Sequence, residues 1–293
     1  TDFYNPNTIR QMLKLKTFDS ADHFIGKYVK NERIKQILSF QTLYIGVSPY
    51  NGPSLYTIIP MIEMLYGVWF IKGGMYTMAS SMERLFKELG GKVYYNASVD
   101  EVLIKDQQAY GIRVKGKEVL SDFVMCNADF PYAMKNLVKD TKSKGKYTDK
   151  KIDSMKYSCS CFVMYLGMDR KYDELDNVHN FFITEELEKN LTDIFDGNKL
   201  EQPSFYVYVG SKLDPSLAPE GKDGLYILVP VPELSSSKYE WTDETVQYYR
   251  KKVMDSLKNV KGLENIEEEI VSETYMTPLD FESKFNAYNG ACF

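Results

Sequence analysis

The sequence has few of the side chains, and none of the loops, on which many enzyme classes depend. Only two histidines, His23 and His179, occur among 293 residues, which excludes most multi-histidine metal sites. There is no Gly-x-Ser-x-Gly elbow, no Walker-type loop and no Gly-x-Gly-x-x-Gly after a predicted strand. The backbone amides of that last loop hold a pyrophosphate at a helix N-terminus. The sequence therefore contains no complete nucleotide site.

Excess positive charge and uninterrupted apolar segments are also absent. The net charge is -5 and the pI is about 5.3, whereas binding to a nucleic-acid duplex needs a concentrated positive field, so we expect no nucleic-acid partner. From Leu43 to Ile71 the only charged residue is Glu63, but prolines and glycines interrupt the stretch and exclude a membrane-spanning helix. Its composition favours buried core, with a lipid-facing or substrate-facing surface as the alternative.

The cysteines do not form a recognisable metal motif. Of Cys126, Cys159, Cys161 and Cys292, only Cys159 and Cys161 are close in sequence, and two thiols without further ligands nearby make no metal site. We therefore expect no metal and a reduced, cytoplasmic protein. The N-terminus has neither the basic lead nor the apolar core of a signal peptide. The sequence starts at Thr1 without an initiator methionine, so we expect an internal piece of a longer protein.

What the sequence does contain is typical of a folded protein. Hydrophobic residues make up 44% and charged residues 26%, and the length suffices for one large domain or two ordinary ones. Aromatic residues are abundant, with 23 tyrosines and 16 phenylalanines. Such residues can line a long apolar tunnel, but composition alone favours their use in cores and rims.

Helical spacing is clearest between Met75 and Leu89, where apolar residues recur on one face. Gly73-Gly74 precede this predicted helix and Gly90-Gly91 end it. Residues 7–40 are also predicted to be helical. Two further helices are expected after Thr184 and Thr242, whose hydroxyls can cap them.

Strands alternate with these helices along much of the chain. Those predicted are residues 93–95, 99–104, 110–114, 123–126, 159–166, 205–209, 225–231 and 266–275. The pattern predicts an α+β (mixed α/β) fold with a mixed sheet and flanking helices. No repeat or low-complexity linker is present, so any domain boundary is expected to arise from interleaved segments.

The order of elements between residues 72 and 129 resembles the flavin-domain segment of the phytoene desaturase and amine oxidase superfamily. That order is Gly73-Gly74, a helix, a strand beginning at Val99, a meander, and then Asn127-Ala128-Asp129. The resemblance implies that Gly73 and Gly74 lie near the flavin, Val99 near the adenine and the last three residues near the pyrophosphate. A tight turn is the alternative for the glycine pair alone.

Five further segments resemble carotenoid desaturases of the phytoene and diapophytoene type. They are residues 44–49, 67–70, 165–167, 178–180 and 277–282. The similarity covers nearly the whole chain, but lacks the family's N-terminal phosphate-binding loop and C-terminal flavin segment. It implies a substrate-binding domain formed by residues 1–70 and 136–293, around a segment of a Rossmann-like FAD domain at residues 71–135.

The function implied is FAD-dependent desaturation of a linear carotenoid precursor such as phytoene or diapophytoene. Such a polyprenyl substrate has no polar group, so its site should be a long apolar tunnel. The residues expected in its wall are Tyr44, Tyr56, Tyr66, Trp69, Phe70 and His179. His179 could act as an acid or base, although a structural hydrogen bond is favoured, and no catalytic residue is assigned. We expect the chain alone to bind FAD weakly and to be inactive.

Two other functions remain open from the sequence. One is that of a related flavoprotein: a carotenoid oxidase, a retinol-saturase-like reductase or an amine oxidase-like enzyme. The other is a non-enzymatic module that binds an apolar ligand. For the desaturase, extraction of the substrate from a bilayer implies an apolar patch that docks on the membrane, so we expect a cytoplasmic protein that associates peripherally with the inner face of the cell membrane.

Overall fold

The computed structural model describes residues 5, 10, 19–175 and 177–292. Residues 7–9 and 11–18 of the helical region predicted at residues 7–40 therefore lie outside the described residues. The chain divides into two compact units. Unit 1 contains residues 1–70, 158–278 and 292–293, and unit 2 contains residues 71–157 and 279–291. The interleaving means that each unit is assembled from segments distant in sequence.

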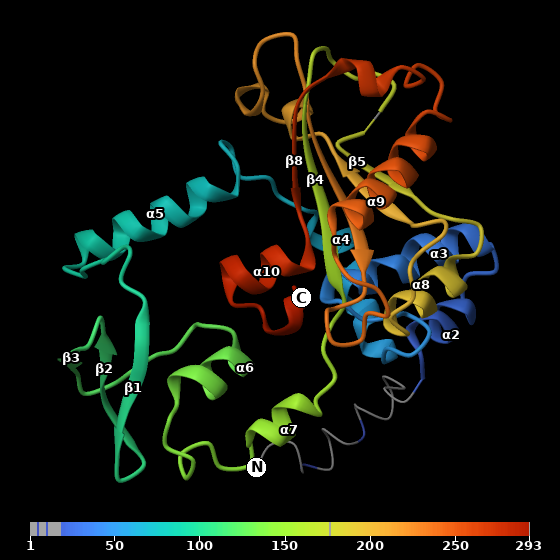
Figure 1. Cartoon of the computed structure of the whole chain (residues 1–293). Coiled ribbons are helices and arrows are strands. Elements are labelled where there is room, and N and C mark those ends of the chain that lie inside the picture. Colours follow the sequence, from blue (N-terminus) through green and yellow to red (C-terminus); the bar gives the residue numbers. More distant parts are fainter. Residues whose placement is uncertain (1–4, 6–9, 11–18, 176, 293) are drawn as a thin grey trace. The chain divides into compact units, whose positions relative to one another are not determined.

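Unit 1 is built on a five-stranded sheet with the order β5-β6-β7-β4-β8 (Figure 1). Its strands are β4 (Ser160–Met168), β5 (His179–Phe182), β6 (Phe205–Tyr208), β7 (Gly224–Val231) and β8 (Ile270–Met276). The α+β class is confirmed. The predicted mixed sheet is corrected in one respect, because every strand pairing in the described part of the chain is antiparallel.

One face of this sheet forms the main core with α8 (Leu187–Phe195) and α9 (Asp243–Leu257). Phe162 of β4 is fully buried, and its ring lies 5.6 Å from that of Trp241 and 6.0 Å from that of Tyr249 in α9. Successive strand residues point to opposite faces, so the alternate residues of β4 supply this core.

The remaining helices of unit 1 are short. They are α2 (Ala21–Gly26), α3 (Glu32–Phe40), α4 (Ile58–Tyr66) and the 3-10 turns η2 (Gln41–Ile45), η3 (Ser54–Thr57), η5 (Gly210–Lys212), η6 (Pro215–Leu217) and η7 (Ile266–Glu269). Ser20 and Asn31 begin α2 and α3, because their side chains accept hydrogen bonds from backbone amides of the first turn.

The apolar stretch from Leu43 to Ile71 is mostly a surface. Met64 is 81% exposed and Trp69 is 86% exposed, and most other large apolar side chains of the stretch are also exposed. Interpreting this stretch as buried core is therefore wrong for most of its large side chains. The physical reason is that apolar side chains occupy every position of α4 except Glu63, so a single neighbour cannot cover them all. Within the described residues, no helix has the length and apolar character needed to cross a membrane.

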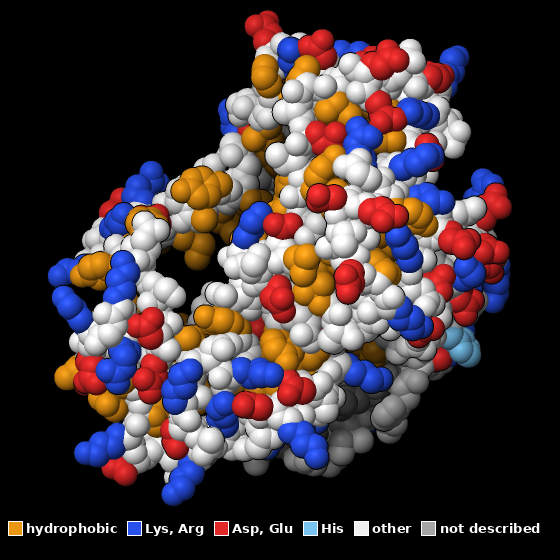
Figure 2. Space-filling model, viewed as in Figure 1, with side chains coloured by type: hydrophobic (Ala, Val, Ile, Leu, Met, Phe, Trp, Pro, Cys, Tyr) orange, Lys and Arg blue, Asp and Glu red, His pale blue; other side chains and the backbone are white. Residues whose placement is uncertain are grey.

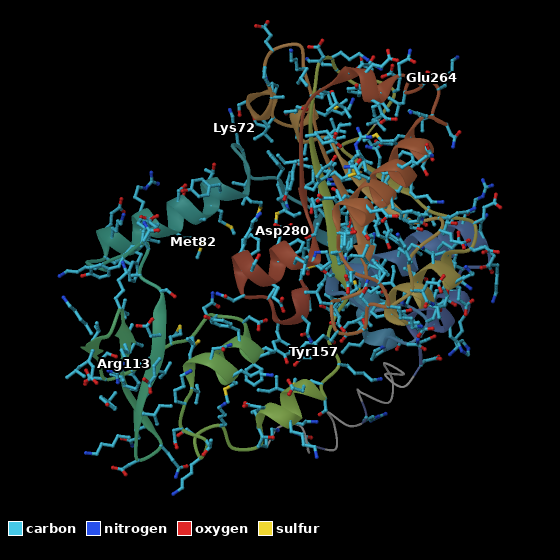
Figure 3. All side chains as sticks on the ribbon, viewed as in Figure 1. Lys72, Met82, Arg113, Tyr157, Glu264 and Asp280 are labelled. Atoms are coloured by element: carbon cyan, nitrogen blue, oxygen red, sulfur yellow. The ribbon has the colours of Figure 1, made fainter. Side chains whose placement is uncertain are left out.

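Unit 2 contains a three-stranded antiparallel meander in the order β1-β2-β3 and a long helix, α5. Its elements are α5 (Met75–Glu88), β1 (Val99–Lys105), β2 (Gln108–Val114), β3 (Lys117–Leu120), α6 (Phe130–Tyr132), the π-turn η4 (Ala133–Leu137), α7 (Asp149–Asp153), α10 (Pro278–Phe285, in unit 2 from Leu279) and η8 (Tyr288–Gly290). Arg113 of β2, labelled in Figure 3, joins the three strands through ion pairs with Glu101 and Glu118.

The helix predicted from Met75 onward is present, but none of its residues is buried. Its apolar side chains lie exposed along α5 (Figure 2). Strands predicted at residues 93–95 and 123–126 do not form. The third strand is β3 instead, because Lys115 and Gly116 both adopt positive φ and reverse the chain directly after β2. Residues 123–126 find no partner strand among the described residues.

Candidate functional site

The second face of the unit 1 sheet, opposite α8 and α9, is lined by aromatic side chains. Strand pairing places them side by side, with Phe181 opposite Tyr206 and Tyr208 opposite Tyr226. The rings of Phe181 and Tyr206 lie 5.1 Å apart, and those of Tyr165 and Tyr226 lie 5.4 Å apart. We call this set the aromatic face. Its members are His179, Phe181, Tyr206, Tyr208, Tyr226 and Tyr165.

The tyrosines of the aromatic face are uncharged at neutral pH. Burial raises the pKa of both Tyr206 and Tyr226 well above the ordinary value of 10.0, because a phenolate would lose its hydration there. Burial also raises the pKa of Tyr165 and of Tyr208. The face therefore presents neutral rings, which suit an apolar ligand.

His179 is held on this face by a hydrogen bond. Its Nδ1 lies 2.6 Å from the hydroxyl oxygen of Tyr206, and the two rings stack with their centroids 5.9 Å apart. The hydrogen bond fixes the orientation of the imidazole, as the structural interpretation of this histidine predicts.

A cavity of about 720 Å³ lies beside the aromatic face. Side chains of α3, η2, α4 and the segment after α4 form its other walls, including Ile37, Tyr44 and Ile62. Ligand-binding cavities typically have volumes of about 300–1,000 Å³ and mainly apolar walls. The cavity is therefore large enough for an extended apolar molecule or a substantial part of one.

Charged groups are scarce in this cavity. Among its described lining residues, Glu63 is the single carboxylate. Burial raises the pKa of the Tyr44 hydroxyl, and the nearby charge of Glu63 adds to that effect. A charged or strongly polar ligand would therefore find few partners here, whereas the transfer of a hydrocarbon from water into this cavity is favourable.

The structure brings together three of the six residues predicted to contact substrate. Tyr44, Trp69 and His179 all line the cavity. Tyr56, Tyr66 and Phe70 do not line it, although Tyr66 accepts a hydrogen bond from the Trp69 indole through its backbone oxygen, at 3.1 Å. A substrate-binding role for these residues stays a prediction.

Three aromatic residues of the wall, Phe40, Phe181 and Tyr206, were not predicted from the sequence. Residues 205–208 read Phe-Tyr-Val-Tyr, with Phe205 and Val207 buried in the core and the tyrosines on the other face. This period of two was available in the sequence and would have identified Tyr206 as facing away from the core.

Unit 2 contains a separate cavity of about 570 Å³. It is bounded by β1, β2, β3 and the segment before α6, and it is lined by Val99, Asn127 and Ala128. These are three of the six residues predicted to bind the cofactor. The next one, Asp129, caps α6, since its carboxylate accepts a hydrogen bond of 3.0 Å from the Tyr132 amide.

Gly73 and Gly74 lie at the start of α5 and do not line the unit 2 cavity. Both have φ of 84°, a conformation that side chains disfavour. A Cβ on Gly73 would also approach the Thr77 hydroxyl to 2.7 Å. The tight-turn explanation therefore accounts for this glycine pair without a ligand, and a cofactor role for it stays a prediction.

The residues of the unit 2 cavity fit one part of a dinucleotide. Hydroxyl and amide groups of Ser98, Ser121 and Asn127 lie among apolar side chains such as Val102 and Ile112, an arrangement suited to a base or a ribose. A pyrophosphate would need further backbone donors from a glycine-rich loop. The site is therefore a partial one for a group such as FAD.

No family model matches the chain. It is, however, 44% identical over 296 residues to the 4,4'-diapophytoene desaturase (4,4'-diaponeurosporene-forming) of Staphylococcus haemolyticus, a match that covers 100% of this chain and 59% of that protein. The enzyme of the same name from Staphylococcus aureus is 43% identical over 297 residues, with the same coverage. The chain is homologous to the diapophytoene desaturases along its whole length. The resemblance predicted from the sequence is thereby confirmed, and the chain spans 59% of the length of these relatives.

Several solved structures share the fold of this chain. A double mutant of putrescine oxidase matches 99% of this chain and 58% of its own, with a TM-score of 0.60 and 13% identity. An oxidoreductase from Methanosarcina mazei matches 88% of this chain and 56% of its own, with a TM-score of 0.56 and 18% identity. At such identities these matches establish the fold alone.

Proposed function

We propose that the protein containing this chain is an FAD-dependent desaturase that introduces double bonds into a linear carotenoid precursor of the diapophytoene type. The observation that carries the proposal is the apolar cavity beside the aromatic face, in a chain 44% identical to 4,4'-diapophytoene desaturases. A related flavoenzyme acting on amines or alcohols would need polar or charged partners for its substrate, and the described lining offers Glu63 as its single carboxylate.

The residues of unit 1 bind and orient the hydrocarbon in this proposal. Rings of Phe181, Tyr206 and Trp69 provide flat contact surfaces, and the aliphatic side chains of α3 and α4 enclose the rest. Removing apolar area from water contributes about 25 cal/mol per Å², so affinity comes from contact area and needs no polar group on the substrate. The same walls exclude water from the carbon–carbon unit that reacts.

The residues of unit 2 contribute to holding the cofactor. Val99, Asn127 and Ala128 would contact the nucleotide end of FAD in the cavity that they line. FAD, when bound, supplies the acceptor for the hydrogen that the substrate loses. Residues outside this chain must provide the remaining phosphate contacts, which is why we expect the isolated chain to bind the cofactor weakly.

Product analysis tests the proposed reaction. In a host that makes diapophytoene and no later carotenoid, the protein containing this chain should yield conjugated polyenes that absorb visible light. A Tyr206→Lys variant, which places a charge in the cavity, should abolish this product. A Leu213→Lys variant, at a site that is already 50% exposed and outside the cavity, should leave it unchanged. An unchanged carotenoid profile with the unmodified protein would contradict the proposal.

We also propose that the protein docks peripherally on a lipid surface, on the cytoplasmic side, through α4. Met64 and Leu65 of this helix are 81% and 65% exposed, and they border an apolar groove of about 640 Å³ shared with α2, α3 and η3. Exposed apolar patches of this kind mark interaction sites. A hydrocarbon substrate resides in lipid, so a surface that enters the bilayer boundary would give the substrate a route to the protein.

Vesicle flotation tests this docking. The chain should float with phospholipid vesicles, and a Met64→Lys, Leu65→Lys double variant should remain at the bottom of the gradient. Val271→Lys serves as the control, because Val271 is 60% exposed but lies on β8, away from α4. Equal flotation of the double variant and the unmodified chain would exclude α4 as the docking surface.

A further inference from the structure

Three of the four cysteines meet in unit 1. Cys161 is buried in β4, Cys159 immediately precedes that strand, and Cys292 follows η8 near the end of the sequence. The backbone amide of Cys292 donates a hydrogen bond of 3.4 Å to the carbonyl oxygen of Cys159. This bond aligns the last described residue with the start of β4, although 131 positions separate Cys161 from Cys292.

The two sulfurs closest to each other belong to Cys161 and Cys292. Their Sγ atoms lie 3.3 Å apart, whereas the Cys292 sulfur is 3.9 Å from the backbone oxygen of Cys159. A disulfide bond is about 2.05 Å long, so the sulfurs need to approach by little more than about 1 Å. Cys292 lies after η8, outside any helix or strand.

The two thiols differ in their accessibility. Burial raises the pKa of Cys161 well above its ordinary value, which keeps this sulfur protonated and shielded. Cys292 is half-buried and therefore offers the entry point for a reagent from solution. An accessible thiol with a second thiol 3.3 Å away can react in a two-step exchange.

We propose that Cys161 and Cys292 form a reversible disulfide by exchange with a low-molecular-weight disulfide such as oxidised glutathione. In the first step the Cys292 thiolate attacks one sulfur of the reagent, forming a mixed disulfide and releasing one glutathione thiolate, which takes up the proton that Cys292 lost. In the second step Cys161 gives up its proton, its thiolate attacks the Cys292 sulfur of the mixed disulfide, and the departing glutathione thiolate takes up that proton. One disulfide is reduced and one is formed, so electrons and protons balance.

The cross-link would lie next to the aromatic face. Cys161 lies on the same side of β4 as Tyr165, four residues further along, and Tyr165 pairs with Tyr226, whose ring lies 6.4 Å from that of Tyr206 in the cavity wall. Oxidation would join Cys292 to β4 beside this face. The cysteine pair is thus a redox-responsive modification site within unit 1.

Thiol counting and peptide mapping test the proposal. The background is a Cys126→Ser variant, because Cys126 is exposed and would react with glutathione by itself. Treatment with oxidised glutathione should remove two thiols from the protein and leave no glutathione bound. Peptide mapping should then show a cross-linked pair of peptides that contain residues 161 and 292. Dithiothreitol should restore both thiols. Cys159→Ser in this background should retain the cross-link.

Variants of the pair provide the contrast. Cys292→Ser should prevent the loss of both thiols, and Cys161→Ser should stop the reaction at a glutathione adduct on Cys292. If Cys161→Ser does not fold, as judged by circular dichroism, Cys161→Ala gives the same readout. Retention of all thiols, a glutathione adduct on Cys292 without cross-linking in the background protein, or a bond between Cys159 and Cys292 would each overturn the proposal.

Discussion

Truncation of Phe181 should weaken the binding of a linear polyene to unit 1 without unfolding it. Phe181 is 42% exposed and forms part of the cavity wall, with its ring 5.6 Å from Phe40 and 5.1 Å from Tyr206. An aromatic side chain buries about 150–250 Å² in total. A ligand could therefore cover roughly 80 Å² of the exposed part, which corresponds to about 2 kcal/mol at ~25 cal/mol per Å². The dissociation constant of Phe181→Ala should rise about 10- to 30-fold.

Tryptophan fluorescence provides the assay for Phe181→Ala. The chain contains two tryptophans: Trp69, which lines the cavity, and Trp241, which is 8% exposed in the core. Diaponeurosporene added in detergent micelles should quench Trp69 saturably and leave Trp241 as a constant background. A Trp69→Phe variant should lose the quenching.

A matched control separates a local effect from a general loss of aromatic area. Phe130 in unit 2 is also 42% exposed and contacts one ring, that of Tyr147 at 4.8 Å. Phe130→Ala should bind the polyene as the unmodified chain does. Equal dissociation constants for Phe181→Ala and the unmodified chain, or an equal loss in Phe130→Ala, would refute the assignment of this cavity.

Two further predictions concern stability. Phe162→Ala should lower the free energy of unfolding by about 3–5 kcal/mol in urea titrations, because the ring is fully buried between sheet and helix, and a loss below ~1 kcal/mol would contradict that packing. Hydrogen bonds from Lys258 and Arg250 lower the pKa of Glu267 below its ordinary value of 4.5. The carboxylate therefore stabilises the fold above that value, and the stability is lost as pH falls through the lowered folded-state pKa. Glu267→Gln should show a shallower loss of stability on acidification, whereas an unchanged acid profile would argue against the ion pairs.

Elements with a strong local pattern could be predicted from the sequence. The helix at Met75–Glu88 follows from helical spacing between glycine pairs, and the buried strands Ser160–Met168 and Gly224–Val231 follow from continuous apolar runs. The α+β class results from the sum of such signals. These elements are specified by neighbouring residues, so the folded context adds little to the assignment.

Elements that depend on distant partners were missed or misplaced. The strand His179–Phe182 is four residues long, which is too short for a recognisable strand pattern in the sequence. It forms because it pairs with Phe205–Tyr208. Residues 123–126 have strand composition but no strand beside them in the described part of the chain. Strand formation requires a hydrogen-bonding neighbour, which composition does not report.

The candidate site shows the same division. Tyr44, Trp69 and His179 were chosen from the sequence and share one cavity, and the alternation at residues 205–208 places Tyr206 on the face away from the core, but that Phe181 lies beside it follows only from strand pairing. The approach of Cys292 to Cys161 was likewise invisible, since it results from tertiary folding across more than a hundred residues.

We propose that the cavity beside the aromatic face holds a linear hydrocarbon. Co-purification of that hydrocarbon with the chain can be measured. The chain should be isolated in detergent from a host that makes diapophytoene, and the bound hydrocarbon should be quantified by chromatography against protein. We expect about one molecule of hydrocarbon per chain. The Tyr206→Lys variant should lose the bound hydrocarbon, and the Leu213→Lys variant should retain it. An empty unmodified chain, or equal loading of Tyr206→Lys, would contradict the account.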